Sequence, residues 1–216
     1  MENQIQKYIY DFVVSFEEFC NTVKTVLKDC HKHAVTWYRL VNRYINIKKA
    51  DLSQTPLEKH ENLQQRLFAT LTYLIYEETI VIEKKLLDLK KLFLNLCIKL
   101  NVFGASCGSV DFTQQTPLVE GSLVQQPLKV LLDLSATAIK FGQAITLQID
   151  DILEGLKFDD SIENINPKIT DCFKISPHWQ RFIESFNELT SNCPSSINEL
   201  YSKLGTSKVI PDTNCT

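Results

Sequence analysis

The sequence predicts an all-α fold, a bundle of three long helices followed by short C-terminal helices. Apolar residues recur at helical spacing over long stretches. Only six Gly and seven Pro occur in 216 residues, and most lie between the periodic stretches. The composition, 44% hydrophobic and 23% charged, is typical of a folded protein with a substantial core.

The first helix is predicted over residues 4–49, and the other helices are expected to cover it. Two apolar positions repeat every seven residues for about six heptads, with no Gly or Pro between them. Such a helix would be roughly 65 Å long and needs other long helices against its apolar stripe. Trp37 is predicted to be buried. The first position holds Ile9, Phe16, Val23, Cys30, Trp37 and Tyr44, and the second holds Ile5, Phe12, Phe19, Val26, His33, Leu40 and Ile47.

A second long helix is predicted over residues 57–102. A break at residues 50–56 precedes it, where Thr55 can cap the helix and Pro56 suits its first turn. The apolar stripe is wider than a two-stranded seam requires, which predicts contacts with two neighbouring helices. The residues that widen it are Val81, Leu87, Leu92 and Leu94.

A long loop is predicted over residues 101–126, where Gly, Pro, Ser, Thr and Gln interrupt the periodicity. It is long for a bundle connection and is a candidate binding loop. A third helix is predicted over 127–157, and two interpretations of its inward face stay open. Either small residues let a neighbouring helix approach closely, or a bulkier face around Leu132 and Ile139 points inward and the glycine is only tolerated. The small residues are Ser135, Ala138 and Gly142.

The C-terminal part is predicted to hold an irregular acidic segment and two short helices. Ser176 and Pro177 begin the first helix, and a capping box at 196–199 begins the second. Residues 1–205 are expected to form a single helical bundle domain, with 206–216 as a flexible tail.

Composition and motifs favour a reduced, non-enzymatic protein. The chain has seven cysteines and no CxxC pair, and its start resembles no signal peptide. No membrane span, cofactor or catalytic motif is recognised. The net charge of −3 argues against a protein that coats nucleic acid, and no direct nucleic-acid binding is predicted.

Cys30 and His33 form the one conspicuous pair of metal-ligating residues. Three residues apart on a helix, they share a face, but a zinc site needs three or four protein ligands, and His60 is the next candidate. The alternative is that His33 is a polar residue of the heptad seam, and no metal is predicted.

Two charged surfaces are the candidate partner-binding sites. One is the basic second half of the first helix, and the other is the acidic end of the third helix. They can face each other within the fold, stay solvated, or bind partners. The residues are Lys24, Lys28, Lys32, Arg39 and Arg43 on the first surface, and Asp150, Asp151, Glu154, Asp159 and Asp160 on the second.

Two stretches resemble the family of AAA+ ATPase-interacting ribosome maturation factors (AIRIM). They are Asn62-Leu-Gln-Gln-Arg-Leu67, at the start of a long amphipathic helix, and Ile152-Leu-Glu-Gly-Leu-Lys-Phe-Asp-Asp160, with Pro167 following. The resemblance covers about residues 15–180. It implies a non-enzymatic helical adaptor subunit that joins a helical sister subunit and an AAA+ unfoldase in large ribosomal subunit maturation, in cytoplasm and nucleus.

Other assignments stay open. The helices after Ser176 extend past the family pattern, so the chain could be closer to the sister subunit family, CINP-like proteins. A Nepro-like nucleolar protein is a further possibility, from Leu71-Thr-Tyr73 and Glu77-Glu78. A coiled-coil structural subunit of a spindle or kinetochore complex would fit the first helix equally well.

Overall fold

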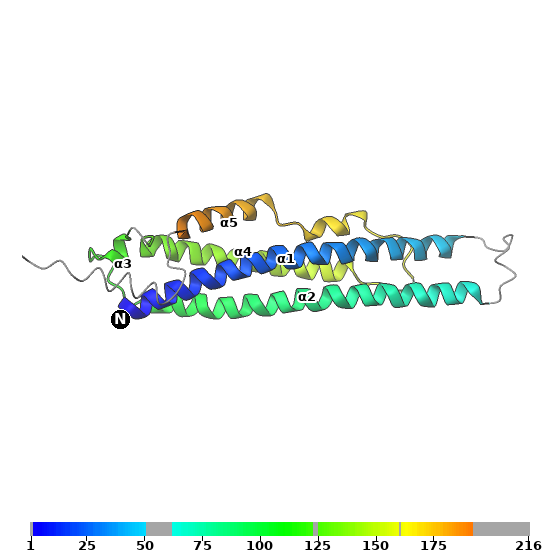
Figure 1. Ribbon diagram of the computed structural model, residues 1–216, viewed down its shortest axis with the longest axis horizontal. Coiled ribbons are helices and arrows are strands. Elements are labelled where there is room, and N and C mark those ends of the chain that lie inside the picture. The colour runs from blue at the N-terminus through cyan, green and yellow to red at the C-terminus, as the bar shows by residue number, and fades with distance from the viewer. Residues whose placement is uncertain (1, 51–61, 123–124, 160, 192–216) are drawn as a thin grey trace, which may run out of the picture. The chain divides into compact units, whose positions relative to one another are not determined.

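The protein is all-α in the computed structural model, which describes residues 2–50, 62–122, 125–159 and 161–191. The elements are α1 (Glu2–Lys49), α2 (Leu63–Cys107), α3 (Pro117–Glu120), α4 (Leu128–Gly155), the 3-10 helix η2 (Pro167–Phe173) and α5 (Pro177–Thr190) (Figure 1). The prediction of three long helices followed by short helical elements is confirmed. The predicted helix at 196–204 and the tail at 206–216 lie outside the described residues.

The predicted C-terminal end of α2 needs correction. Residues 101–107 belong to α2 and not to the predicted loop, because Phe103 and Cys107 continue its buried stripe. Gly104 is tolerated there at roughly 1 kcal/mol, the usual cost of a helical glycine. At the other end Asn62 takes a left-handed backbone conformation, φ 64°, which asparagine tolerates, and the helix begins at Leu63. The predicted start at 57–61 and the cap at Thr55 and Pro56 fall outside the described residues.

Two short elements occupy segments that were predicted to be irregular. Thr116 accepts a hydrogen bond from the Val119 amide at the start of α3, inside the predicted loop. Asn166 accepts one from the Lys168 amide, 2.9 Å away, at the start of η2. Both caps are followed by proline, as is typical of first helical turns. Elements of four and seven residues are too short for a periodicity to reveal.

The heptad pattern of α1 predicts two buried positions. The first is buried in every heptad, whereas the second is buried only in the N-terminal part of the helix. All six residues of the first position are buried, and Trp37 is 0% exposed, as predicted. The second position is buried only up to Phe19. A straight helix has 3.6 residues per turn, so a strict heptad stripe drifts around it by about 20° per heptad. The buried side therefore moves onto Cys20, Leu27, Ala34 and Val41.

The chain folds into two compact units, and α1, α2 and α4 contribute to both. Unit 1 takes its described residues from Met1–Phe19, Asn95–Lys140 and His178–Thr216. Unit 2 takes its described residues from Cys20–Leu94 and Phe141–Pro177.

Unit 1 is built around a cluster of phenylalanine rings. Phe12 of α1 stacks on Phe103 of α2, with ring centroids 5.6 Å apart and an interplanar angle of 12°. Phe186 of α5 meets Phe16 edge-on at 4.5 Å and Phe12 at 5.7 Å. These geometries are the favoured ones for aromatic pairs, so the cluster holds α5 against α1 and α2.

Unit 2 depends on a close approach of α2 to α4. A Cβ atom built on Gly142 would lie 1.9 Å from the Phe93 ring, so the ring occupies the place of a side chain. The interpretation that a small residue of the third helix admits a neighbouring helix is confirmed at Gly142, and the glycine is not merely tolerated. α2 also lies beside α1 in this unit (Figure 1), where His33 Nδ1 is 2.7 Å from Glu78 Oε2. The predicted contact of the second helix with two neighbours is thus observed.

Gly142→Ala is expected to destabilise the protein by roughly 1–3 kcal/mol, because the added carbon overpacks the buried Phe93 ring. The control is Gly104→Ala, where nothing lies within 4 Å of the added carbon. That change should stabilise the protein by up to about 1 kcal/mol through helix propensity. Denaturant melting measures both, and equal effects of the two changes would contradict the packing.

Trp37→Ala is expected to cost roughly 3–5 kcal/mol in unfolding free energy, as large-to-small changes in a core do. Trp37→Phe should cost much less. Among the described residues Trp37 Nε1 has no hydrogen-bond partner. Phenylalanine leaves some buried volume unfilled, but it also removes this unsatisfied donor, which offsets part of the cost. Denaturant melting of the alanine variant with a loss under about 1 kcal/mol would place Trp37 at the surface.

Candidate docking groove on unit 2

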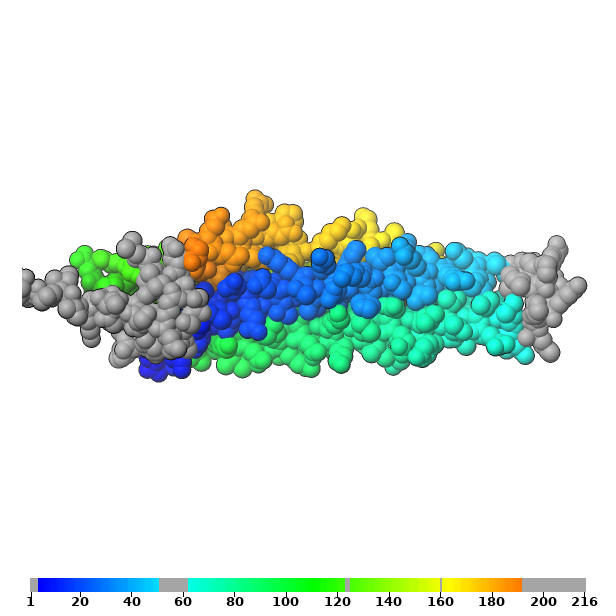
Figure 2. Space-filling model, in the orientation of Figure 1, coloured from blue at the N-terminus to red at the C-terminus, as the bar shows by residue number. Residues whose placement is uncertain are grey.

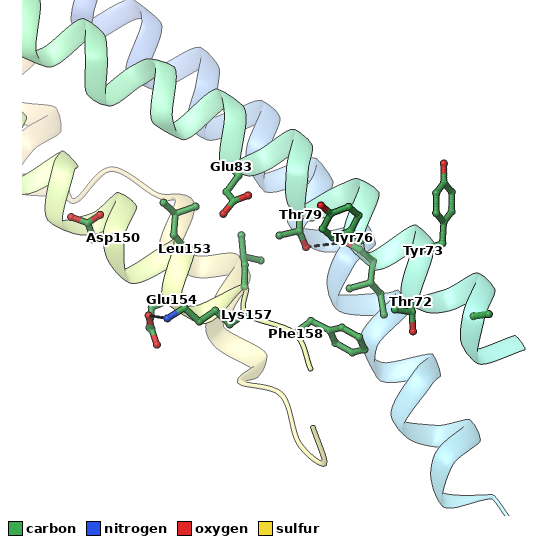
Figure 3. Close-up of a pocket in the computed structure, with 13 residues that line it drawn as sticks. Thr72, Tyr73, Tyr76, Thr79, Glu83, Asp150, Leu153, Glu154, Lys157 and Phe158 are labelled. Carbon is green, nitrogen blue, oxygen red and sulfur yellow. Dashed lines mark hydrogen bonds and ion pairs between the residues drawn. The ribbon is translucent and has the colours of Figure 1, made fainter. Parts of the chain in front are cut away.

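An open groove of about 800 Å³ lies between the N-terminal half of α2 and the end of α4 (Figure 3). Its floor is apolar, formed by buried Ile75 and Leu156 with half-buried Leu153. Tyr73 and Tyr76 stand on the α2 side with about three fifths of each side chain exposed (61% and 62%). The groove therefore offers apolar and aromatic surface directly to solvent.

Contacts on both sides hold the α4 wall of the groove. α4 runs antiparallel to α2 in unit 2 (Figure 1), and Lys90 Nζ of α2 lies 2.7 Å from Asp150 Oδ1. On the other side Gln148 Nε2 donates to the carbonyl oxygens of Cys172 and, at 3.0 Å, Lys174. These bonds fasten the end of η2 to α4.

A second glycine brings η2 close to the end of α4. A Cβ atom on Gly155 would lie 2.5 Å from Ile169 Cδ1. Ile169 is buried, and it fills the space that a side chain at position 155 would occupy. Gly155 belongs to the second stretch of the AIRIM resemblance, so this residue of the stretch has a packing role here.

The rim of the groove is acidic, with one carboxylate left open. The rim carries Glu83, Asp150 and Glu154 against the single cation Lys157. Lys157 pairs with Glu154, and Lys90 pairs with Asp150. Within the described ranges no hydrogen bond or ion pair is made by Glu83, whose side chain extends from α2 towards α4 (Figure 3). The Glu83 carboxylate is therefore available to pair with a cationic group of a ligand.

Glu77 orders one of the aromatic side chains. Its carboxylate accepts a hydrogen bond from the Tyr73 phenol, and this bond, followed by the charge of Glu77, raises the pKa of Tyr73 above its usual range. The hydrogen bond also limits the orientations open to the ring, which lowers the entropy cost of placing a partner against it.

The acidic surface predicted from the sequence contributes to this groove only in part. Asp150 and Glu154 line it, whereas exposed Asp151 does not. The Asp159 carboxylate accepts hydrogen bonds from the Ser161 side chain and amide, which lower its pKa, and it lies outside the lining. Asp160 falls outside the described residues.

The predicted basic surface lies exposed on α1 in unit 2. Among described residues no ion pair joins it to the acidic end of α4, and Lys32 pairs with Asp29 of its own helix at 2.9 Å. The two charged segments do meet at the C-terminal end of α1, where, besides the hydrogen bonds from Ser161, the charge of Lys48 helps to lower the pKa of Asp159, and Lys49 Nζ donates to the Glu163 carbonyl oxygen at 3.1 Å. The basic residues are Lys24, Lys28, Lys32, Arg39 and Arg43.

Three residues of the groove were missed by the sequence reasoning: Tyr73 and Tyr76 as binding residues, and Glu83. A usable signal existed for Tyr73 but not for Tyr76. Tyr73, Ile80, Leu87 and Leu94 repeat every seven residues on α2, in a line separate from its buried stripe. For Glu83 no signal existed, because its place opposite α4 depends on the tertiary contact.

That line continues beyond the groove as an exposed apolar face. Tyr73, Ile80, Leu87 and Leu94 are 61%, 40%, 45% and 62% exposed, and we call these four residues the outer face of α2. In the space-filling view, the cyan to green part of α2 in unit 2 has α1 on one side and no described element on the other (Figure 2). α2 thus carries one stripe of buried apolar side chains and a second line of apolar side chains that is exposed to solvent.

Cys30 and His33 do not come together with further metal ligands in the described part of the chain. No group of three or more His, Cys, Asp or Glu side chains suited to a metal is found there, and His60 lies outside it. Burial raises the pKa of the Cys30 thiol to about 11, which opposes the thiolate that a metal needs. His33 instead contacts Glu78 on α2 and lies half-buried beside the seam of α1.

α4 is, by length and composition, the one helix among the described residues that could cross a membrane. The core helices of folded proteins share this length and composition. In unit 1 α4 buries Leu128 and Leu131, and in unit 2 it buries Phe141, Ile145 and Ile149.

Comparison with known proteins adds no relative. No protein-family model matches the chain, and no curated protein or solved structure shows significant similarity to it.

Alkylation of Cys30 in the native protein is expected to be very slow. A thiol with a pKa of about 11 is only about one part in a thousand thiolate at pH 8, roughly 100-fold less than a thiol of pKa 9. Because the pKa is raised, the rate should climb with pH up to about 11. Mass spectrometry after iodoacetamide treatment measures it, with half-buried Cys172 for comparison. Equal labelling of the two cysteines at pH 8 would contradict the burial.

Proposed function

We propose that the chain is a non-catalytic helical adaptor that works by docking onto other proteins, in an AAA+ ATPase complex that matures the large ribosomal subunit. The observation that carries the docking role is the outer face of α2. Eight of the twelve exposed large apolar side chains among the described residues belong to this one helix. Apolar surface gathered in this way on a folded protein usually marks an interaction site.

The spacing of the outer face favours a helix as the docking partner. Residues seven apart lie on nearly the same side of a helix, so a second helix laid along α2 would meet all four side chains. Charged residues flank the line, including the pair of Lys91 and Asp88, 2.9 Å apart. Such flanking charges keep a seam soluble before it is covered and help to select the partner. A helical sister subunit is the kind of partner this surface suits.

The AAA+ complex is proposed from the family resemblance. The two stretches that carry it lie in unit 2, the first just before the α2 wall of the groove in the chain and the second within its other wall. Residues 62–67 include the first turn of α2, and residues 152–159 include the α4 wall. A shared location beside an open surface supports the idea that these stretches serve recognition.

Changing Leu87 and Leu94 to Ser is expected to abolish partner capture while leaving the fold intact. Both side chains are already exposed, so their loss should shift stability by less than about 1 kcal/mol. The loss of two interface anchors should reduce recovery of partners by more than roughly tenfold. The measurement is affinity purification from cells followed by mass spectrometry, alongside melting curves. Leu147→Ser, 67% exposed on α4, is the matched control.

Two results would contradict the proposal. If the wild-type protein recovers no AAA+ ATPase or ribosome-assembly factor, the proposed complex is wrong, and recovery of spindle components would favour the coiled-coil scaffold. If the double variant recovers the wild-type partners in full, the outer face is not the docking surface.

A further inference from the structure

The groove on unit 2 combines an apolar floor with an acidic rim that its own lysines do not fully neutralise. Ile75, Leu153 and Leu156 form the floor, and Tyr76 rises from it. Lys157 and Lys90 each pair with one carboxylate, and Glu83 is left over among the described residues. A ligand that matches this surface carries an apolar side and positive charge.

We propose that this groove receives a basic amphipathic helix from a partner protein, with a lysine or arginine beside Glu83. The proposal rests on the proposed docking function and adds the chemistry of the partner segment. The apolar ridge of the incoming helix lies over Ile75 and Leu153, against the ring of Tyr76. Its basic residues face the carboxylate rim.

The form of the groove favours a helix over an extended peptide or a small molecule. More than half of the lining residues are exposed, so the site is open along its length and does not enclose a small ligand. The α2 wall and the α4 wall up to Gly155 are helical, so their backbone groups are largely hydrogen-bonded internally and offer no edge to an added β-strand. Leu156, Lys157 and Phe158 continue the second wall past the end of α4. A helix presents side chains at i, i+3, i+4 and i+7 on one face, which suits an open surface of this kind.

The charges of the groove determine whether an acidic or a basic partner helix fits it. The existing pairs already hold Asp150 and Glu154, so an acidic helix would meet Glu83 without compensation. A basic helix gains an ion pair at Glu83 and can also approach Glu154, whose side chain is 71% exposed. Exposed charges of this kind govern partner choice and association rate more than total affinity. Binding should therefore weaken as salt rises.

The test is selection from three displayed peptide sets on the full-length protein. Two sets hold amphipathic helices of about 18 residues, roughly 27 Å long, with the same apolar ridge and either Lys and Arg or Asp and Glu at the flanking positions. The third set holds proline-rich peptides, which bind other aromatic-lined grooves. We expect the basic helices to be enriched over both other sets. Enrichment of either other set, or of none, would overturn the proposal.

Variants of the protein locate the binding site. For one enriched basic peptide, Glu83→Lys should weaken binding roughly fivefold to tenfold, through lost attraction and added repulsion. Tyr76→Ser should weaken it by more than roughly tenfold, as loss of an aromatic anchor does. The matched controls are Glu184→Lys and Leu147→Ser, which change an exposed carboxylate on α5 and an exposed apolar side chain (67%) of α4 outside the lining. Groove variants that bind as tightly as the controls would overturn the assignment.

Two further measurements exclude other occupants. Sedimentation of the protein alone tests a second copy, and self-association that Tyr76→Ser abolishes would overturn the proposal. A photo-crosslinker at position 76 tests the chain's own segments, and capture of residues 192–216 in place of the peptide would also overturn it. Failure of the adaptor role has a different signature. In that case affinity purification recovers no AAA+ complex, whereas the peptide selection can still succeed.

Discussion

The contact between the Phe93 ring and Gly142 is the interaction on which unit 2 depends. It places an aromatic side chain of α2 where α4 has no side chain at all, and it thereby sets how closely the two helices meet. The Lys90–Asp150 pair lies farther along the same antiparallel contact. The groove begins at that pair and extends to where α4 ends. Its width therefore follows from a packing contact outside its lining.

Polar contacts in unit 2 align the helices, whereas apolar burial stabilises them. The pair of Lys85 and Asp29 is partly exposed, at 3.4 Å, and contributes little to the free energy of folding. The buried side of α1 and the residues facing it on α2 and α4 contribute far more. Surface charge is consequently available for recognition, and the groove and outer face of α2 can be changed with little effect on folding.

The sequence predicted the long helices because their periodicity is local information. The six buried heptad residues of α1, and Trp37 among them, follow from spacing alone. The drift of the buried side onto Leu27 and Ala34 does not, since it depends on where neighbouring helices lie. The role of Gly142 stayed open for the same reason, because only the tertiary contact with Phe93 decides it. Capped elements as short as α3 and η2 have no periodicity to detect.

The candidate site was predictable only as separate pieces. Asp150 and Glu154 stood out as part of an acidic run, but nothing in the sequence joins them to Tyr76 and Glu83. The wide stripe of α2 was interpreted as contact with two neighbours. Those contacts exist, yet Leu87 and Leu94 remain exposed. A wide apolar pattern on a helix reflects the surfaces that the helix buries within its own fold together with those that it buries only in a complex.

Hydroxyl-radical footprinting most directly tests the central claim, which is that another protein covers the groove and the outer face of α2. The labelling of Tyr76 and Leu87 is compared between the purified protein and the protein isolated from cells with its partners. Exposed Leu147 of α4 serves as the internal reference. We expect Tyr76 and Leu87 to react readily in the free protein and to be protected several-fold in the complex, as core residues of an interface are, with Leu147 unchanged. Equal labelling of Tyr76 and Leu87 in both samples would contradict the account.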